Sequence, residues 1–187
     1  HNDAITWRHL LQQTSEWEGT LWSKPDQVDR NRQVGPNAND SQKGQPRQLM
    51  KPGSYWEYND VRVNLAALCL TRLFETSLSD VLRKTIMDPI GASHSWEWHG
   101  YRNSYVKIKG RAIQSVSGGA HWGGGLWISS LDHARMGLLI AQQGRWGNVE
   151  ILPKHCLTPL FDPCPLNLNY GFLWWLNTNR GLFPGAN

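Results

Sequence analysis

The sequence contains no run of apolar residues that approaches the ~20 needed by a membrane-spanning helix, so no membrane span is expected. Charged residues are also scarce: they make up 18% of the 187 residues, whereas apolar residues make up 40%. This balance is typical of a folded globular protein and excludes a disordered chain. The length gives room for one ordinary domain with a sizeable core.

Metal-binding and redox motifs are absent as well. The three cysteines (Cys69, Cys156 and Cys164) lack Cys-x-x-Cys spacing, and although Cys156 and Cys164 could pair, the odd count favours free thiols. The seven histidines form no His-Glu-x-x-His pattern, and no glycine-rich segment carries the Gly-Lys-Ser/Thr of a phosphate-binding loop. The sequence therefore predicts no metal site.

The net charge is only +4, and one polar stretch holds several of the basic residues: Arg30, Arg32, Lys43, Arg47 and Lys51. A mild excess of this kind is typical of a solvated surface, so we expect no nucleic-acid partner. The chain shows no secretory signal at His1, which leaves a periplasmic or a cytoplasmic location open.

Hydrophobic periodicity predicts an α+β chain that is mainly helical with a few strands. Residues 24–53 have little periodicity and many Pro, Asn, Gln and Gly residues, which indicates a long surface loop. A glycine-rich loop is expected at 117–125. Helices are predicted over 5–13, 61–74, 77–88, 130–143 and 153–160, a β-hairpin over 105–114, and an aromatic strand over 170–176.

Eleven tryptophans are an unusually large number for a chain of this length. One interpretation is that they serve as core and loop anchors, since indole rings bury a large apolar area. The other is that they line an aromatic-walled cleft for an apolar or amide substrate. The sequence alone leaves both open.

The segment Pro52–Asp60 stands directly before the predicted helix 61–74 and places a phenol, Tyr58, and a short carboxylate, Asp60, together in a loop. A tyrosine that acts as a base needs its pKa lowered from about 10, or a cation nearby to stabilise the phenolate. The alternative is that Tyr58 is simply a loop aromatic before a helix. Its neighbours in the sequence favour the catalytic interpretation.

Tyr58-Asn59-Asp60 resembles the Tyr-x-Asn motif of the serine β-lactamase and penicillin-binding-protein superfamily. The segment 121–135, His-Trp-Gly-Gly-Gly-Leu-Trp-Ile-Ser-Ser-Leu-Asp-His-Ala-Arg, closely resembles its Gly-Gly-Gly-Leu-x-Ser-Thr-x-Asp-x-Ala-Arg motif. Other segments similar to those of the family follow in the family's order: 12–16, 52–53, 87–92, 144–152 and 170–175. The chain thus resembles class C β-lactamase-like serine hydrolases, which include β-lactamases, D-Ala-D-Ala peptidases, family VIII-type esterases and 6-aminohexanoate-oligomer amidases.

This resemblance implies a β-lactamase/transpeptidase-like fold, with residues 1–187 as a single incomplete domain. The missing segments of the same protein would supply the N-terminal Ser-x-x-Lys and the C-terminal strands. An ester, amide or β-lactam carbonyl would be attacked by that serine, Tyr58 would shuttle the proton, and Asp60 would help hold the network. The resemblance implies no metal or cofactor. His121 and Trp122 would line the cleft, or would pack under the glycine-rich loop.

One Ser-x-x-Lys occurs within the chain, at Ser104-Tyr105-Val106-Lys107. It falls on a predicted strand, where residues three apart point to opposite faces, so we expect it not to be catalytic. Without an upstream Ser-x-x-Lys the chain could also be a non-catalytic protein on the same scaffold. Such a protein would recognise peptidoglycan-like or aromatic ligands through its tryptophans, although a deliberate binding module would be expected to keep the missing strands.

Overall fold

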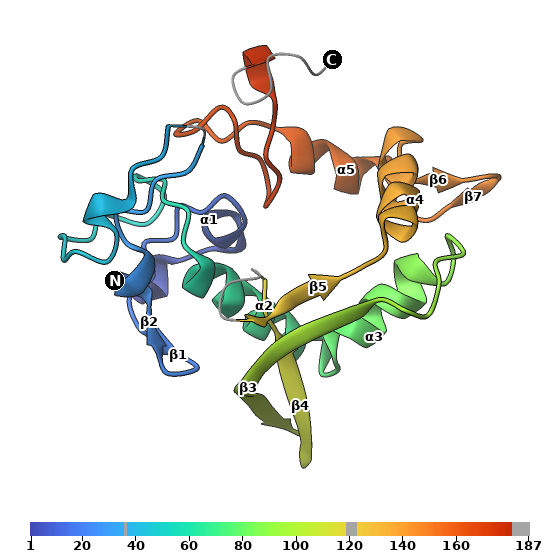
Figure 1. Ribbon diagram of the computed structural model, residues 1–187, viewed down its shortest axis with the longest axis horizontal. Helices are drawn as coiled ribbons and strands as arrows, with labels where there is room; N and C mark the ends of the chain where they lie inside the picture. Colours follow the sequence, from blue (N-terminus) through green and yellow to red (C-terminus); the bar gives the residue numbers. More distant parts are fainter. Residues whose placement is uncertain (36, 119–122, 181–187) are drawn as a thin grey trace. The chain divides into compact units, whose positions relative to one another are not determined.

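The computed structural model describes residues 1–35, 37–118 and 123–180 (Figure 1). The chain divides into two compact units: residues 1–66 with 159–187, and residues 67–158. The chain passes from one unit to the other inside helix α2 and passes back inside helix α5. Within the described ranges, every helix is too short or too polar to span a bilayer.

Helices and strands are mixed, as the α+β prediction requires. The helices are α1 Trp7–Leu11, α2 Asp60–Phe74, α3 Leu78–Leu82, α4 Ser130–Ala141 and α5 Lys154–Phe161. The strands are β1 Thr20–Leu21, β2 Lys24–Pro25, β3 Glu97–Ile108, β4 Arg111–Val116, β5 Gly125–Trp127, β6 Arg145–Trp146 and β7 Val149–Glu150. Short 3-10 turns occupy Asn2–Ala4, Asp26–Asp29, Asp40–Gln42 and Thr178–Arg180, and a π turn at Arg83–Met87 prolongs α3.

In the first unit, side-chain caps set where both helices begin. Thr6 and His9 form a reciprocal capping box at the start of α1, which is shorter than the predicted 5–13. Asn59 caps α2: its Oδ1 accepts the backbone N–H groups of Val61 at 3.1 Å and Arg62 at 3.2 Å. The helix predicted over 61–74 is confirmed.

The segment 24–53 has little regular structure, as predicted, but its charged residues are not a solvated surface. The side chains of Arg30 and Arg47 are only 8% and 14% exposed, and both form ion pairs with buried carboxylates. Arg47 lies 2.6 Å from Glu16 and 2.7 Å from Glu57. The prediction of a solvated basic stretch is therefore wrong for these arginines, because they neutralise acids that the rest of the unit buries, whereas Lys51 is exposed as predicted.

The second unit has an apolar core of its own. Met87, Ile90, Trp96 and Leu139 form one buried cluster. Ser77 caps α3 by accepting the N–H of Ser79, and α3 with its π turn ends at the Asp88 C-cap, which agrees with the predicted helix 77–88.

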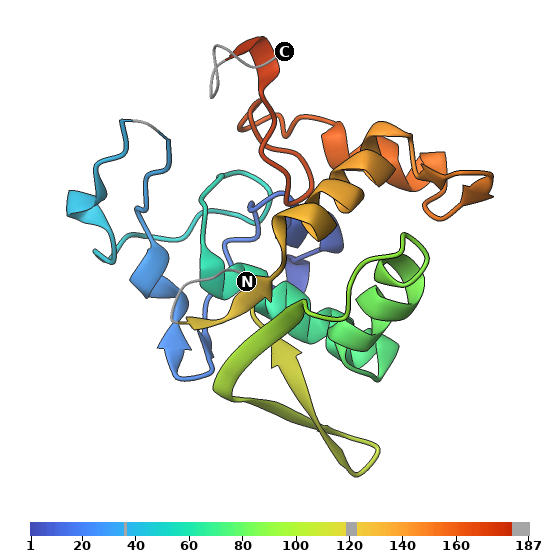
Figure 2. The ribbon, with the colours of Figure 1, turned by 45° about the vertical axis from the view of Figure 1, so that its right-hand side comes forward.

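The three-stranded antiparallel sheet of this unit has the order β4-β3-β5. Figures 1 and 2 show β3 as a long curved strand with β4 and β5 beside it. Lys109 and Gly110 both have positive φ, at 48° and 81°, so they form the two-residue turn expected of a β-hairpin. The hairpin prediction over 105–114 is confirmed, although β3 begins earlier, at Glu97.

The predicted aromatic strand over 170–176 is wrong. Tyr170 and Trp175 pair only through an isolated antiparallel bridge, and Leu173 between them has a φ of 58°. The chain reverses at this point, so Tyr170 becomes buried while Trp174 and Trp175 remain about 40% and 38% exposed. A run of aromatic residues raises strand propensity, but here the chain reversal and the packing of the rings determine the backbone conformation.

The three cysteines are free thiols.

Helix α4 begins at a compact polar cap centred on the buried Asp132. Ser129 accepts the N–H of Asp132 at 3.1 Å, and Ser93 donates to the Asp132 carboxylate through both its N–H, at 3.0 Å, and its hydroxyl, at 2.5 Å. These Ser93 bonds, with smaller contributions from Ser129 and Arg135, lower the pKa of Asp132 to about 2.

Because this pKa is depressed in the folded protein, Asp132 stabilises the fold above its unfolded pKa of about 3.9, and that stabilisation is lost as the pH falls from about 4 to about 2. We expect the difference in melting temperature between the wild type and Asp132→Asn to shrink across this interval. Thermal unfolding at a series of pH values measures it, with the exposed Asp88→Asn as the control. A difference that stays constant down to pH 2 contradicts the assignment.

Candidate active site

Tyr58 lies two residues before the start of α2 and its phenol is half-buried. The guanidinium of Arg32 lies over its ring, 4.9 Å from the centroid. On other sides the ring meets Trp175, with centroids 5.4 Å apart, and Tyr170, with centroids 6.3 Å apart. The phenol is thus held by a cation and two aromatic rings from segments far apart in the sequence.

The electrostatics of this position favour the protonated phenol. Burial raises the pKa of Tyr58, and the negative charge of Asp60 adds to the rise. The positive charge of Arg32 and a hydrogen bond from the indole of Trp175 act in the opposite direction without cancelling it. Burial likewise raises the pKa of Tyr170. Tyr58 is therefore held in its protonated form, and a base role requires a further cation near its hydroxyl.

Asp60 is buried, and its carboxylate takes part in a second group of charges. Its Oδ2 lies 3.0 Å from Nη1 of Arg32, and its backbone N–H donates to Asp29 at 3.0 Å. Lys43 lies 3.2 Å from the other oxygen of Asp29. The two negative charges of this group are thus balanced by two positive charges. The ion pair with Asp60 also holds Arg32 over the ring of Tyr58.

Two of the predicted site residues, His121 and Trp122, lie outside the described part of the chain. The internal Ser-x-x-Lys does not form a catalytic pair. The hydroxyl of Ser104 is buried between the carbonyl oxygens of Tyr101, at 3.0 Å, and Ser115, at 2.7 Å, whereas Lys107 is exposed on the opposite face of β3.

Sequence reasoning missed the residues that surround Tyr58. Arg32 is 28 residues from Asp60 and was assigned to a solvated stretch, and Trp175 was assigned to a strand. The only signal for Trp175 was the abundance of tryptophan, which allowed an aromatic-walled cleft as one of two interpretations, and no sequence signal pointed to Arg32.

A pocket of about 400 Å³ lies next to these residues, within the first unit. Two of its lining residues, Arg32 and Trp175, are the same ones that contact Tyr58. Its lining is Arg32, Gln33, Val34, Trp56, Asn167, Asn169 and Trp175. The pocket therefore combines aromatic walls with several amides and one guanidinium.

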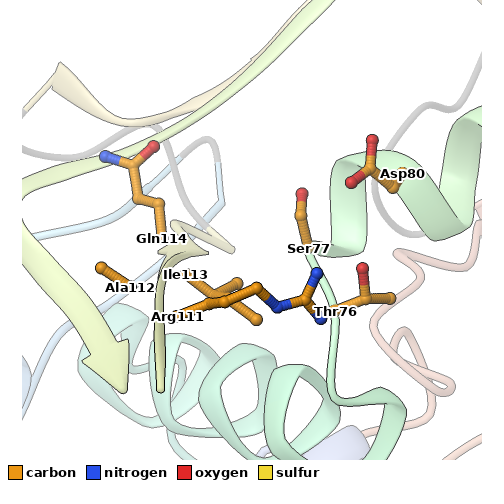
Figure 3. Close-up of a pocket in the computed structure, with 7 residues that line it drawn as sticks. All are labelled: Thr76, Ser77, Asp80, Arg111, Ala112, Ile113 and Gln114. Atoms are coloured by element: carbon orange, nitrogen blue, oxygen red, sulfur yellow. The ribbon is translucent and has the colours of Figure 1, made fainter. Parts of the chain in front are cut away.

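The second unit has a smaller pocket of about 260 Å³ between β4 and the start of α3. Figure 3 shows the side chain of Arg111 directed toward Thr76, with Ser77 and Asp80 on the same side. This pocket contains no aromatic side chain and none of the predicted site residues. Among residues 1–35, 37–118 and 123–180, no three His, Cys, Asp or Glu side chains converge in the manner of metal ligands.

Comparison with known proteins identifies the family of the chain. The family model described as Beta-lactamase matches residues 1–150. A comparison with curated protein sequences found no match.

Two solved structures share the fold. One, described as a "putative beta-lactamase" from Bacteroides dorei DSM 17855, is 19% identical, with a TM-score of 0.57 over 91% of this chain and 52% of that one. The other, a penicillin-binding protein from Bacillus halodurans, is 17% identical, with a TM-score of 0.56 over 91% of this chain and 56% of that one. The chain spans about half the length of these structures. It belongs to the Beta-lactamase family and has the corresponding serine-hydrolase-type fold.

Proposed function

We propose that this chain is part of a serine hydrolase that cleaves an ester, amide or β-lactam bond through an acyl-enzyme, with Tyr58 as the proton shuttle. The observation that carries the proposal is the position of Tyr58: a half-buried phenol directly before α2, oriented by Arg32 and Trp175, in a chain of the Beta-lactamase family. The tyrosine that the sequence motif singles out is therefore also the one that the surrounding side chains hold in a defined orientation.

In this mechanism the nucleophilic serine and its lysine come from segments of the parent protein outside this sequence. The serine oxygen bonds to the substrate carbonyl carbon while its proton passes to the lysine–Tyr58 pair. Collapse of the tetrahedral intermediate breaks the bond to the leaving group, which takes up a proton from the Tyr58 hydroxyl. Water then cleaves the acyl-enzyme and regenerates the serine. Asp60, by pairing with Arg32, keeps the ring of Tyr58 in place.

A second candidate is a non-catalytic protein that binds an aromatic or peptidoglycan-like ligand on the same scaffold. The pocket lined by Trp56 and Trp175 favours it, because paired indoles provide a binding surface without any nucleophile. This candidate and the hydrolase share the same pocket and differ only in covalent chemistry.

Labelling of the parent protein with a fluorophosphonate distinguishes the two. For the hydrolase we expect one adduct by intact-mass spectrometry, mapped by peptide sequencing to a serine outside residues 1–187, and no adduct after the protein is heat-unfolded. An adduct on Ser104 would contradict the assignment of that serine to a buried structural role. The absence of any adduct on folded protein would favour the binding protein.

A further inference from the structure

The pocket beside Tyr58 has walls suited to a flat apolar group. Trp56 and Trp175 meet edge to face within it, with ring centroids 5.9 Å apart and planes at 75°. Two indoles at this angle present one face and one edge to an occupant, an arrangement that favours another ring. The volume of about 400 Å³ is within the range of small-molecule sites.

The amide side chains of the pocket offer donors to an occupant. The Oε1 of Gln33 already accepts the N–H of Asn39 at 3.0 Å, and the Oδ1 of Asn167 accepts the N–H of Asn169 at 3.1 Å. Each oxygen keeps one further lone pair, whereas the NH2 group of each side chain can only donate and has two hydrogens to offer. Donors therefore outnumber the remaining acceptor positions on these two side chains, and an occupant with acceptor oxygens complements them.

The charge balance of the pocket favours a neutral occupant. Its one cation, Arg32, is paired with Asp60 at 3.0 Å and lies 3.9 Å from Asp29. Lys43 balances the second of these acids. A carboxylate that entered the pocket would lose water without gaining an uncompensated cation, and this costs more free energy than the burial of a neutral carbonyl.

We propose that this pocket binds a neutral carbonyl group, an amide or an ester, that is attached to an apolar ring, and that the substrate of the parent enzyme therefore carries an aromatic or cyclic group next to a neutral carbonyl. That this occupant is part of the substrate rests on the proposed role of Tyr58. Binding itself depends only on the pocket residues.

Three probes of matched shape test the proposal by isothermal titration calorimetry on the parent protein: 3-phenylpropionamide, 3-phenylpropionate and propylbenzene. We expect the amide to bind more tightly than both others. The proposal is overturned if the carboxylate binds more tightly than the amide, if the hydrocarbon binds as tightly as the amide, or if none of the three binds. Because no reaction is measured, this result is independent of fluorophosphonate labelling.

Isosteric variants test which groups make the contact. Gln33→Glu and Asn167→Asp keep the side-chain oxygens that accept the N–H groups of Asn39 and Asn169, but replace the NH2 donors with oxygen. Each is expected to weaken amide binding about threefold to tenfold. Asn148→Asp, an exposed position in the second unit, makes the same charge change and should leave binding unaltered. Unchanged amide binding in both pocket variants would also overturn the proposal.

Discussion

The substitution Tyr58→Phe in the parent protein is expected to lower kcat/KM for ester or amide hydrolysis by about 10²- to 10⁴-fold. The phenylalanine ring keeps the packing against Trp175 and the stacking of Arg32, whose contacts are with the aromatic ring. Only the hydroxyl is lost, and with it the proton that the leaving group takes up. The effect should therefore fall on kcat, with KM nearly unchanged.

Steady-state hydrolysis of an unactivated alkyl ester or an amide, whose leaving group needs a proton, with fluorophosphonate labelling in parallel, separates the steps. The matched control is Tyr105→Phe, because Tyr105 is 53% exposed on β3 and loses the same hydroxyl. A Tyr58→Phe protein that keeps its full activity would remove Tyr58 from the mechanism. An equal loss in the Tyr105→Phe control would show that the effect is not specific to the site.

The parts of the fold that follow local rules could be predicted from the sequence. Helix α2 was visible from the spacing of Leu65, Leu68 and Leu73, and the β3–β4 turn from Lys109-Gly110. The position of Tyr58 before a helix followed from the same local signals. These features depend on contacts between residues close in the sequence, where periodicity and turn chemistry are informative.

The surroundings of Tyr58 depend on distant contacts and could not be predicted in this way. Arg32 reaches Asp60 across 28 residues, and Arg47 reaches Glu16 across 31. A basic residue in an irregular segment looks the same in sequence whether it is solvated or paired with a buried acid. Its partner is determined by tertiary packing, and neither composition nor periodicity contains information about such contacts.

Glu16 is a further residue whose surroundings depend on distant contacts. Its φ of 50° is a conformation that favours glycine. Its fully buried carboxylate binds Arg47 and Arg62. Burial alone would raise the pKa of Glu16, but the hydrogen bonds from Arg47 and the N–H of Met50, with the charges of Arg62 and Arg47, lower it below its ordinary value.

Besides the group around Asp29 and Asp60, the first unit buries a balanced group of three arginines and three carboxylates: Arg30, Arg47, Arg62, Glu16, Asp26 and Glu57. Arg62 is central because its side chain is 1% exposed and lies 2.8 Å from Glu16, 3.2 Å from Asp26 and 3.3 Å from Glu57. It also donates to the carbonyl of Trp17 at 3.2 Å. This one side chain connects α2 to three separate acids.

Arg62→Met is therefore expected to lower the free energy of unfolding by about 3–5 kcal/mol, since it leaves one buried negative charge without compensation. Urea denaturation of the chain measures the change. Arg72→Met removes an exposed arginine from the last turn of the same helix and should change the unfolding free energy by no more than about 0.5 kcal/mol.

A double substitution separates the charge from the volume of the lost side chain. Asp26→Asn in the Arg62→Met background restores the balance of buried charge, so the two changes together should cost less than their sum. Strict additivity would mean that the two groups act independently and that the arginines stabilise the unit by packing alone. A non-additive result would show that Arg62 of α2 and Asp26 of the irregular segment 24–53 are energetically coupled across their 3.2 Å contact.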